Sequence, residues 1–276
     1  MLYLVATPIG NLEDITLRAL KVLKSVEILA CEDTRNTQKL LNHYEITGKK
    51  LISYHEYNEE KTSEKIISYL EEGREVALVT DAGMPCISDP GYILVEKIKK
   101  AGLPITTLPG ANAGLTALVA SGIESYNYTF YRFLPRKSKD LKLKLEEILK
   151  MNTTSILYES PHRVKNLVEE ISKISPTRKI SVARELTKMF EQIETSSAEE
   201  ILEMLGNKIK EKGEFVVIIS PNRDEKSEDV NFDELVELIY QKVQNGEKKS
   251  EAIKNISKEF GINKKEVYSL YHEKYD

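Results

Sequence analysis

A short apolar run that leads into a stiff loop and then a helix most constrains the fold of this chain. Residues 76–79 are apolar at every position, which is typical of a strand buried on both faces of a parallel sheet. Residues 92–101 then carry apolar side chains at helical spacing. Because successive parallel strands need a crossover connection, usually a helix, this unit predicts an α/β fold.

The same alternation continues along the chain in two sets. The first set has predicted strands at residues 2–7, 26–31, 49–53, 75–80 and 105–108, with helices at 14–24, 34–43, 58–72 and 92–101. The second set has predicted strands at residues 126–133, 154–158, 180–183 and 215–220, with helices at 115–122, 138–151, 161–174 and 198–212. We therefore expect two α/β domains, residues 1–114 and 115–221, and the alternation favours a largely parallel sheet covered by helices on both faces.

The chain changes character after residue 220. Residues 221–229 are typical of a linker, and residues 230–276 predict a small helical domain. Its apolar positions are Leu235, Val236, Leu238, Ile239, Val243, Ala252, Ile253 and Ile256. Residues 260–268 resemble the turn and second helix of a helix-turn-helix, with Gly261 at the bend. Eight lysines face five glutamates between Lys242 and Lys274, a balance that contact with RNA and a solvated helical face explain equally well.

Composition excludes several classes of protein. With 40 basic and 44 acidic residues the net charge is −4, so the chain is not basic overall, although a local basic face stays open. No apolar stretch is long enough to span a bilayer and no signal sequence follows Met1, so we expect a cytoplasmic protein. Cys31 and Cys86 lack the spacing of zinc ligands, so we expect no metal site.

The loop after the strand at residues 75–80 is the first candidate for a ligand site. Residues 80–91 hold two glycines, two prolines and two aspartates. Asp89 is expected to cap the next helix and Pro90 to occupy its first position. Open α/β sheets bind ligands at the carboxyl ends of their strands, and an ordinary strand-to-helix connection would not need so many special residues.

Charged side chains follow three further predicted strands. They stand at residues 32–35, 159–163 and 184–188. At the first of these, Asp33 or Thr34 can be a simple helix cap, whereas Arg35 can bind a phosphate or carboxylate. Such convergence of strand ends is how an α/β site is built. The first loop, residues 7–12, lacks the GxGxxG spacing and no GxxxxGK[ST] is present, so a phosphate-bearing cofactor is not indicated.

These motifs together resemble one family. They are Val5–Leu12, Glu32–Arg35, Asp81–Gly83 with Ile87–Gly91, Tyr158–Arg163 and Arg184–Lys188. In this order they are similar to the ribosomal RNA small-subunit methyltransferase I family of the tetrapyrrole-methylase superfamily. The resemblance covers residues 2–220, and the helical tail is similar to a small C-terminal domain that many members carry.

The resemblance implies two α/β domains with an S-adenosylmethionine cleft between them, in a homodimer that methylates the ribose 2′-hydroxyl of a cytidine in the decoding region of 16S rRNA. By position in the motifs, the cofactor residues would be Pro8, Ile9, Asp81, Ala82, Gly83, Met84, Ile87, Asn112, Ala113, Tyr158, Leu186 and Glu214. Two positions depart from the family pattern. Met84 stands where threonine is common, and Arg132 where glycine is usual, which leaves the shape of that loop open.

A ribose hydroxyl is a weak nucleophile, so a base or a cation near it should help the transfer. Our hypothesis is that Glu185 or Glu159 accepts the proton, while Lys188 or Arg35 stabilises the developing oxyanion.

A basic run is the predicted RNA contact, with a solvated helix face as the alternative. It comprises Arg132, Arg136, Lys137, Lys139, Lys142 and Lys144. Two other functions stay open: methylation of a small tetrapyrrole by the same fold, and RNA or ribosome binding without catalysis.

Overall fold

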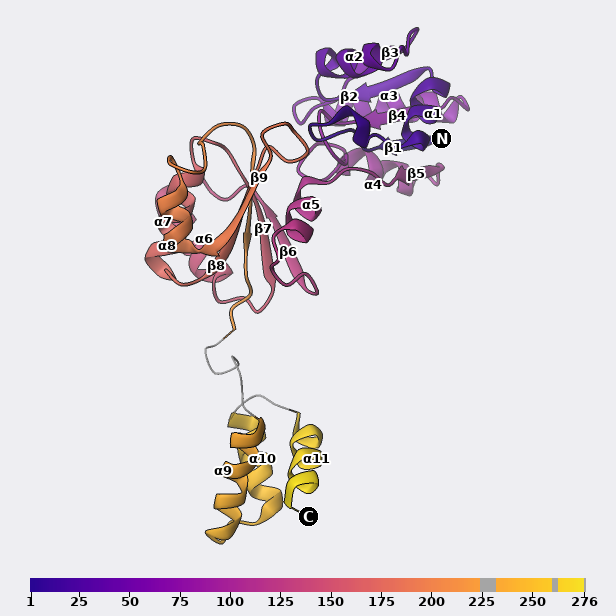
Figure 1. The fold of residues 1–276 in the computed structure, drawn as a ribbon. Coiled ribbons are helices and arrows are strands. Elements are labelled where there is room, and N and C mark those ends of the chain that lie inside the picture. Colours follow the sequence, from indigo (N-terminus) through magenta and orange to yellow (C-terminus); the bar gives the residue numbers. More distant parts are fainter. Residues whose placement is uncertain (224–231, 260–262, 276) are drawn as a thin grey trace. The chain divides into compact units, whose positions relative to one another are not determined.

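The computed structural model describes residues 1–223, 232–259 and 263–275 (Figure 1). The chain divides into two compact units, residues 1–221 and 222–276. The first unit contains two five-stranded sheets with their helices, and the second is helical. The α/β prediction with a helical C-terminal region is thereby confirmed.

The first sheet is entirely parallel, as predicted. Its strands, in the spatial order β3-β2-β4-β1-β5, are β1 (Leu2–Val5), β2 (Ile28–Cys31), β3 (Lys50–Ser53), β4 (Val76–Val79) and β5 (Ile105–Leu108). The helical segments are η1 (Leu12–Asp14), α1 (Leu17–Ser25), α2 (Thr34–His43), α3 (Glu59–Glu71) and α4 (Tyr92–Lys100).

Helices cover both faces of this sheet because alternate strand residues point to opposite sides. In β4, Val76 and Leu78 belong to the same apolar cluster as Ile66 of α3 and Ile98 of α4. The intervening residues of β4 pack instead in a second cluster with α1 and α2. The continuous apolar run of β4 therefore reflects burial on two sides.

The second sheet is mixed, which the alternation of strands and helices did not predict. Its strands, in the order β6-β7-β10-β8-β9, are β6 (Tyr128–Arg132), β7 (Thr154–Glu159), β8 (Lys179–Arg184), β9 (Gln192–Ser197) and β10 (Phe215–Ile219). Only the β6–β7 pair is parallel. The edge strand β9 was missed because it is mostly polar and half-buried along its whole length.

One helix lies on one side of the second sheet and three lie on the other (Figure 1). They are α5 (Ala113–Ala120) on the first side, and α6 (Ser138–Ile148), α7 (Val164–Ile174) and α8 (Ala198–Met204) on the second. Helix α8 is shorter than predicted, because Leu205 leaves the helix with an extended backbone.

Helix α4 begins at Tyr92 as predicted, but the expected roles of Asp89 and Pro90 at its start were wrong, and so was the expected start of α7. Helix α4 is capped by Gly91, whose φ of 139° suits glycine, so Asp89 is free of the capping role. Helix α7 begins at Val164, because the N–H groups of Arg163 and Val164 both donate to the Ser160 carbonyl and form a turn first. Pro161 and His162 therefore precede the helix.

The second unit contains α9 (Phe232–Gln244), α10 (Lys249–Glu259) and α11 (Lys264–Tyr275). Ile239, Ile253 and Ile256 are fully buried in its core, as their helical spacing predicted. The predicted bend at Gly261 and most of the predicted linker lie outside the described residues. Within the described parts of the chain, no helix is long and apolar enough to cross a membrane.

Candidate functional site

A cavity of about 370 Å³ lies where strand ends of the two sheets meet. From the first sheet it takes residues that follow β1, β4 and β5, and from the second it takes residues around β6, β7, β8 and β10. Its lining comprises Ile9, Ala82, Gly83, Met84, Ile87, Ser88, Asp89, Asn112, Ala113, Phe133, Tyr158, Glu159, Ser160, Pro161, Leu186, Gly213, Glu214, Phe215 and Val216. We call it the first cavity.

The structure places most of the predicted cofactor residues in this first cavity. The exceptions are Pro8 and Asp81, which line a second cavity of about 320 Å³. Ile9, Ala82 and Glu214 line both cavities. The two cavities therefore adjoin, and their shared wall includes one carboxylate.

The exits of β1 and β4 are joined by a backbone bridge beside both cavities. Thr7 and Gly83 exchange two hydrogen bonds, of 2.9 and 3.0 Å, and the Thr7 hydroxyl donates to the Thr80 carbonyl. Gly83 has a φ of 82°, and a Cβ there would lie 3.5 Å from the Ile9 side chain. A glycine is therefore favoured at this position by its backbone conformation.

Backbone strain gathers at the loop after β4. Cys86 and Ser88 have positive φ angles of 70° and 74°, a conformation that costs about 1–3 kcal/mol in non-glycine residues. Arg132 is also left-handed, with a φ of 59°, and its guanidinium donates to the Ser88 carbonyl at 2.5 Å. The position where a glycine was expected thus keeps a glycine-like backbone and adds a bond that joins β6 to this loop. Ser88 lines the first cavity, and its hydroxyl is buried with no hydrogen-bond partner among the described residues.

Asp89 is the most perturbed carboxyl of the first cavity. Its pKa is raised to about 6, mainly by burial and also by the nearby carboxylates of Glu32 and Asp81, while a hydrogen bond with Thr80 and the charge of Arg132 limit the rise. The pKa of Glu32 is also raised, by burial and by Asp81. Such a group is stabilised in its ionised form by an incoming cation.

The charges around the first cavity select against a phosphate. Asp89, Glu159 and Glu214 line it, and this lining, all of it within described residues, includes no lysine or arginine. Much of the remaining wall is apolar, with Ile9, Ile87 and Leu186 among its side chains. The cavity therefore fits an amphipathic cation.

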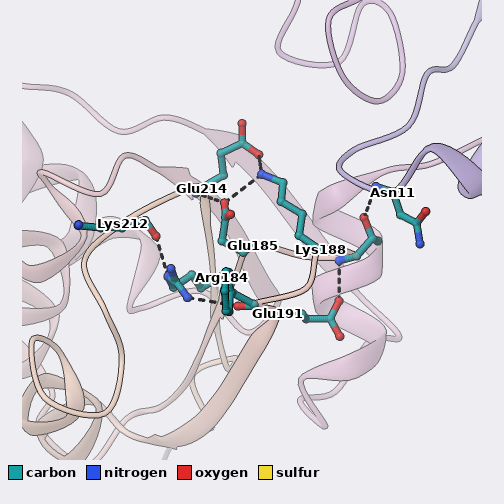
Figure 2. A network of polar contacts seen from close by, with 9 residues as sticks. Asn11, Arg184, Glu185, Lys188, Glu191, Lys212 and Glu214 are labelled. Atoms are coloured by element: carbon teal, nitrogen blue, oxygen red, sulfur yellow. Dashed lines mark hydrogen bonds and ion pairs between the residues drawn. The ribbon is translucent and has the colours of Figure 1, made fainter. Parts of the chain in front are cut away.

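The loop after β8 holds a network of polar contacts beside the second cavity (Figure 2). Figure 2 shows the Lys188 ammonium between two carboxylates, 2.9 Å from Glu185 and 3.0 Å from Glu214. Burial lowers the pKa of Lys188, but hydrogen bonds to Glu185 and Glu214 outweigh it and the net pKa is raised. Lys188 is therefore a permanent cation in the wall of the second cavity.

The two predicted bases differ in their surroundings. For Glu185, burial raises the pKa, but the Lys188 ammonium and the Glu214 backbone N–H outweigh burial and leave the pKa lowered. For Glu159, burial dominates and the pKa is raised, although the Ser160 N–H and the Arg163 guanidinium act against it. Glu159 lines the first cavity, whereas Glu185 accepts a hydrogen bond from the Lys188 ammonium.

Arg35 is not brought to either cavity wall. Its guanidinium pairs with Asp33 at 2.6 Å, and the Arg35 side chain is 85% exposed. Asp33 caps α2 by accepting from the Arg35 N–H, which is the helix-cap alternative considered above. Asp81 accepts from the Asp33 N–H and the Asn36 amide, so it ties the exits of β2 and β4 together.

The side chains of the basic run differ in their contacts. Arg132 is held by Ser88, and Lys144 pairs with Glu147 at 2.7 Å. The other four are exposed and take part in no ion pair found among described residues: Arg136, Lys137, Lys139 and Lys142. They lie in the loop after β6 and on α6.

Comparison with known proteins now bears on this site. A family model described as tetrapyrrole (corrin/porphyrin) methylases matches residues 1–202. The ribosomal RNA small subunit methyltransferase I of Halalkalibacterium halodurans is 44% identical over 275 residues, covering 99% of this chain and 94% of the relative. The protein of that name from Bacillus subtilis is 43% identical, with coverage of 99% and 94%. The chain belongs to the ribosomal RNA small subunit methyltransferase I family.

Membership in this family confirms the resemblance inferred from the motifs and makes the chain a methyltransferase. A further member, from Hydrogenobaculum, is 47% identical over 220 residues, which are 79% of this chain but 95% of the relative. Its unmatched part is too small to hold a counterpart of all of residues 222–276.

Two solved structures share the fold. Diphthine synthase has a TM-score of 0.58 at 14% identity, with coverage of 79% of this chain and 89% of its own. A uroporphyrin-III-C-methyltransferase from Thermus thermophilus has a TM-score of 0.53 at 19% identity, with coverage of 79% and 93%. At such identities the likeness shows the fold alone.

Some lining residues were missed from the sequence. They are Ser88, Phe133, Ser160, Pro161, Gly213, Phe215 and Val216, besides Asp89, which was assigned to a helix cap. Gly213, Phe215 and Val216 stand at the start of β10, and a search of strand ends cannot find them. Because β10 is antiparallel to β7 and β8, its start lies at the same edge as their ends.

Proposed function

We propose that this chain transfers a methyl group from S-adenosylmethionine to the ribose 2′-hydroxyl of a cytidine in the decoding region of small-subunit rRNA. The observation that carries the proposal is the pair of adjoining cavities. The first has carboxylates and apolar walls, and the second has Lys188 and Glu214 in its wall. The printed name of the full-length relatives supports rRNA as the substrate.

The residues of the first cavity fit S-adenosylmethionine. Asp89 and Glu214 match its positive charge, and the apolar side chains match its uncharged parts. When bound there, the cofactor supplies an activated methyl group on a positively charged sulfur. The part of the chain in such a transfer is to align the acceptor oxygen and to exclude water.

The acceptor hydroxyl belongs in the second cavity under this proposal. Lys188, a permanent cation, stabilises the oxygen as it loses its proton. Glu214 accepts that proton, because its carboxylate lines both cavities and its side chain is 77% exposed. Glu159 is the alternative base, whereas the lowered pKa of Glu185 makes it a weak one.

A basic surface and a homodimer complete the proposal. Arg136, Lys137, Lys139 and Lys142 are free to contact phosphates. The dimer interface lies within residues 115–128, where large apolar side chains are exposed on α5 and near β6. They are Leu115, Val119, Tyr126 and Tyr128. Sedimentation of the purified protein at micromolar concentration tests the dimer.

The function itself is tested by transfer of a labelled methyl group. The protein is mixed with S-adenosylmethionine labelled on its methyl group and with small ribosomal subunits from cells that lack this activity. Nuclease digestion and mass spectrometry then locate the label. We expect it on a cytidine ribose of the decoding region. Cofactor binding without transfer to subunits or naked rRNA would contradict the proposal and favour a small tetrapyrrole as acceptor.

A further inference from the structure

The tip of the loop after β8 exposes two large apolar side chains. Met189 is 91% exposed and Phe190 is 68% exposed. They follow Lys188, which lines the second cavity. Single exposed apolar residues are common, but two adjacent ones beside a site suggest that a ligand or partner binds over them.

The backbone that carries these side chains is held rigidly. Glu185 and Thr187 both have positive φ angles, of 51° and 65°. The Thr187 N–H donates to the Glu191 carboxylate at 2.6 Å, and the Thr187 hydroxyl accepts from the Asn11 N–H at 3.0 Å. The Arg184 guanidinium donates to the Phe190 carbonyl at 3.2 Å. So many bonds to a strained loop fix where its apolar tip lies.

The sheet register places this tip on the same edge as the basic run. Arg132 pairs with Leu157 near the end of β7, Glu159 at that end pairs with Phe215, and Phe215 pairs with Arg184. The loops after β6, β7 and β8 therefore leave one edge of the sheet, in the order β6-β7-β10-β8. Residues of both cavities lie between the basic run and the tip along this edge.

The loop before β10, which is fixed beside β8, carries exposed lysines. Lys210 and Lys212 are exposed, and the Arg184 guanidinium donates to the Lys212 carbonyl at 2.6 Å, which fixes that loop beside β8. Exposed apolar side chains on the same edge of the sheet as the basic run match a single-stranded nucleic acid, whose bases stack and whose phosphates are negative.

We propose that Met189 and Phe190 form a stacking platform for an unpaired base of the RNA next to the nucleotide that is methylated. The inference rests on the proposed function, since it assigns a second contact to the same substrate. RNA-binding proteins recognise single strands by stacking splayed bases on aromatic side chains. The platform positions the RNA strand and takes no part in the chemistry.

Substitution at Phe190 tests the platform through RNA affinity. Stacking is worth about 1–3 kcal/mol per base, so Phe190→Ala should weaken binding of a decoding-region RNA oligonucleotide by about tenfold. Affinity for S-adenosylmethionine should stay unchanged, since Phe190 is outside the first cavity. Phe190→Trp should restore RNA binding, which a merely structural defect would not allow.

The same variant reports the contact directly, because the native chain has no tryptophan. We expect the oligonucleotide to quench the fluorescence of Phe190→Trp. Met151→Trp is the matched control, since Met151 precedes β7 and so lies at the opposite edge of the sheet. Its fluorescence should stay unchanged.

Three results would overturn the inference. The first is that Phe190→Ala binds the oligonucleotide as tightly as the wild type does. The second is that the fluorescence of Phe190→Trp is not quenched when RNA is bound. The third is that Phe190→Ala no longer sediments as a dimer, which would show that the tip contacts a second copy of the chain. In each case wild-type methyl transfer to small subunits keeps the proposed function intact. Its absence overturns both proposals.

Discussion

The loops after β4 and β8 both contain residues with strained backbone angles, but they differ in which side chains they expose to water. The first buries polar groups, and the second exposes apolar ones. The loop after β4 holds the Asp89 carboxyl and the Ser88 hydroxyl largely out of water. The loop after β8 holds Met189 and Phe190 in water. Each arrangement costs free energy in the isolated protein, and each is relieved by a different ligand. A small cation suits the first, and a strand of stacked bases suits the second.

Removing the cation of the β8 loop should have the largest effect. Lys188→Met leaves the second cavity without its ammonium, so we expect single-turnover methyl transfer to fall by about 10²–10³, the usual loss for one oxyanion-stabilising group. Cofactor affinity should change less than about twofold. Lys188→Arg keeps the charge and should retain much of the rate. A wild-type rate in Lys188→Met would remove the β8 loop from the chemistry.

Reversing charge at the far end of the same edge should affect RNA binding alone. Arg136→Glu combined with Lys137→Glu should weaken RNA affinity by about tenfold or more at 0.1 M salt. The slope of the logarithm of the binding constant against the logarithm of the salt concentration should also become shallower by about 1.4. Each single-strand phosphate contact contributes about 0.7 to that slope, and two contacts are lost. Fluorescence anisotropy of labelled RNA measures both. Lys150→Glu, at the opposite edge, is the control. Equal loss of cofactor binding would indicate misfolding instead.

The β4 loop should give cofactor binding a pH dependence. The pKa of Asp89 is about 6, and a bound cation favours its ionised form, so binding releases a proton at low pH. Affinity for S-adenosylmethionine should therefore rise about tenfold per pH unit below pH 6 and level off above it. Calorimetric titration from pH 5 to 8 checks this. In Asp89→Asn the step should vanish, and an unchanged step would assign it to another group.

Arg132 offers the smallest and most specific test, because its two contributions can be separated. Arg132→Ala loses the bond to the Ser88 carbonyl but keeps a left-handed non-glycine residue, whereas Arg132→Gly also relieves the backbone. We expect Arg132→Gly to be more stable than Arg132→Ala by about 1 kcal/mol in urea unfolding. Equal stabilities would show that the loop relaxes around either residue.

Much of the site could be predicted from the sequence because parallel strands bring their carboxyl ends to one edge. That rule located the loops around Gly83, Tyr158 and Leu186, and the structure places all three in one cavity. It failed at Phe215, which starts an antiparallel strand at the same edge. Strand direction depends on long-range pairing, which local periodicity does not contain.

The sequence also did not show which partners each side chain would contact. Aspartate often caps helices, and Asp89 stands just before α4. Gly91 nevertheless caps α4, and Asp89 lines the cavity. Arg35 follows a strand as a ligand-binding residue would, yet Asp33 lies two residues away and pairs with it. In both cases the local motif allows two roles, and only the packed loop decides between them.

The assignment of the first cavity to the cofactor is tested most directly by filling it. Ala113 lines the first cavity but not the second, so Ala113→Phe blocks one and spares the other. Calorimetry should show S-adenosylmethionine binding to the wild type and none to Ala113→Phe, while the variant still binds decoding-region RNA. Binding of S-adenosylmethionine to Ala113→Phe with wild-type affinity would contradict the account and place the cofactor elsewhere.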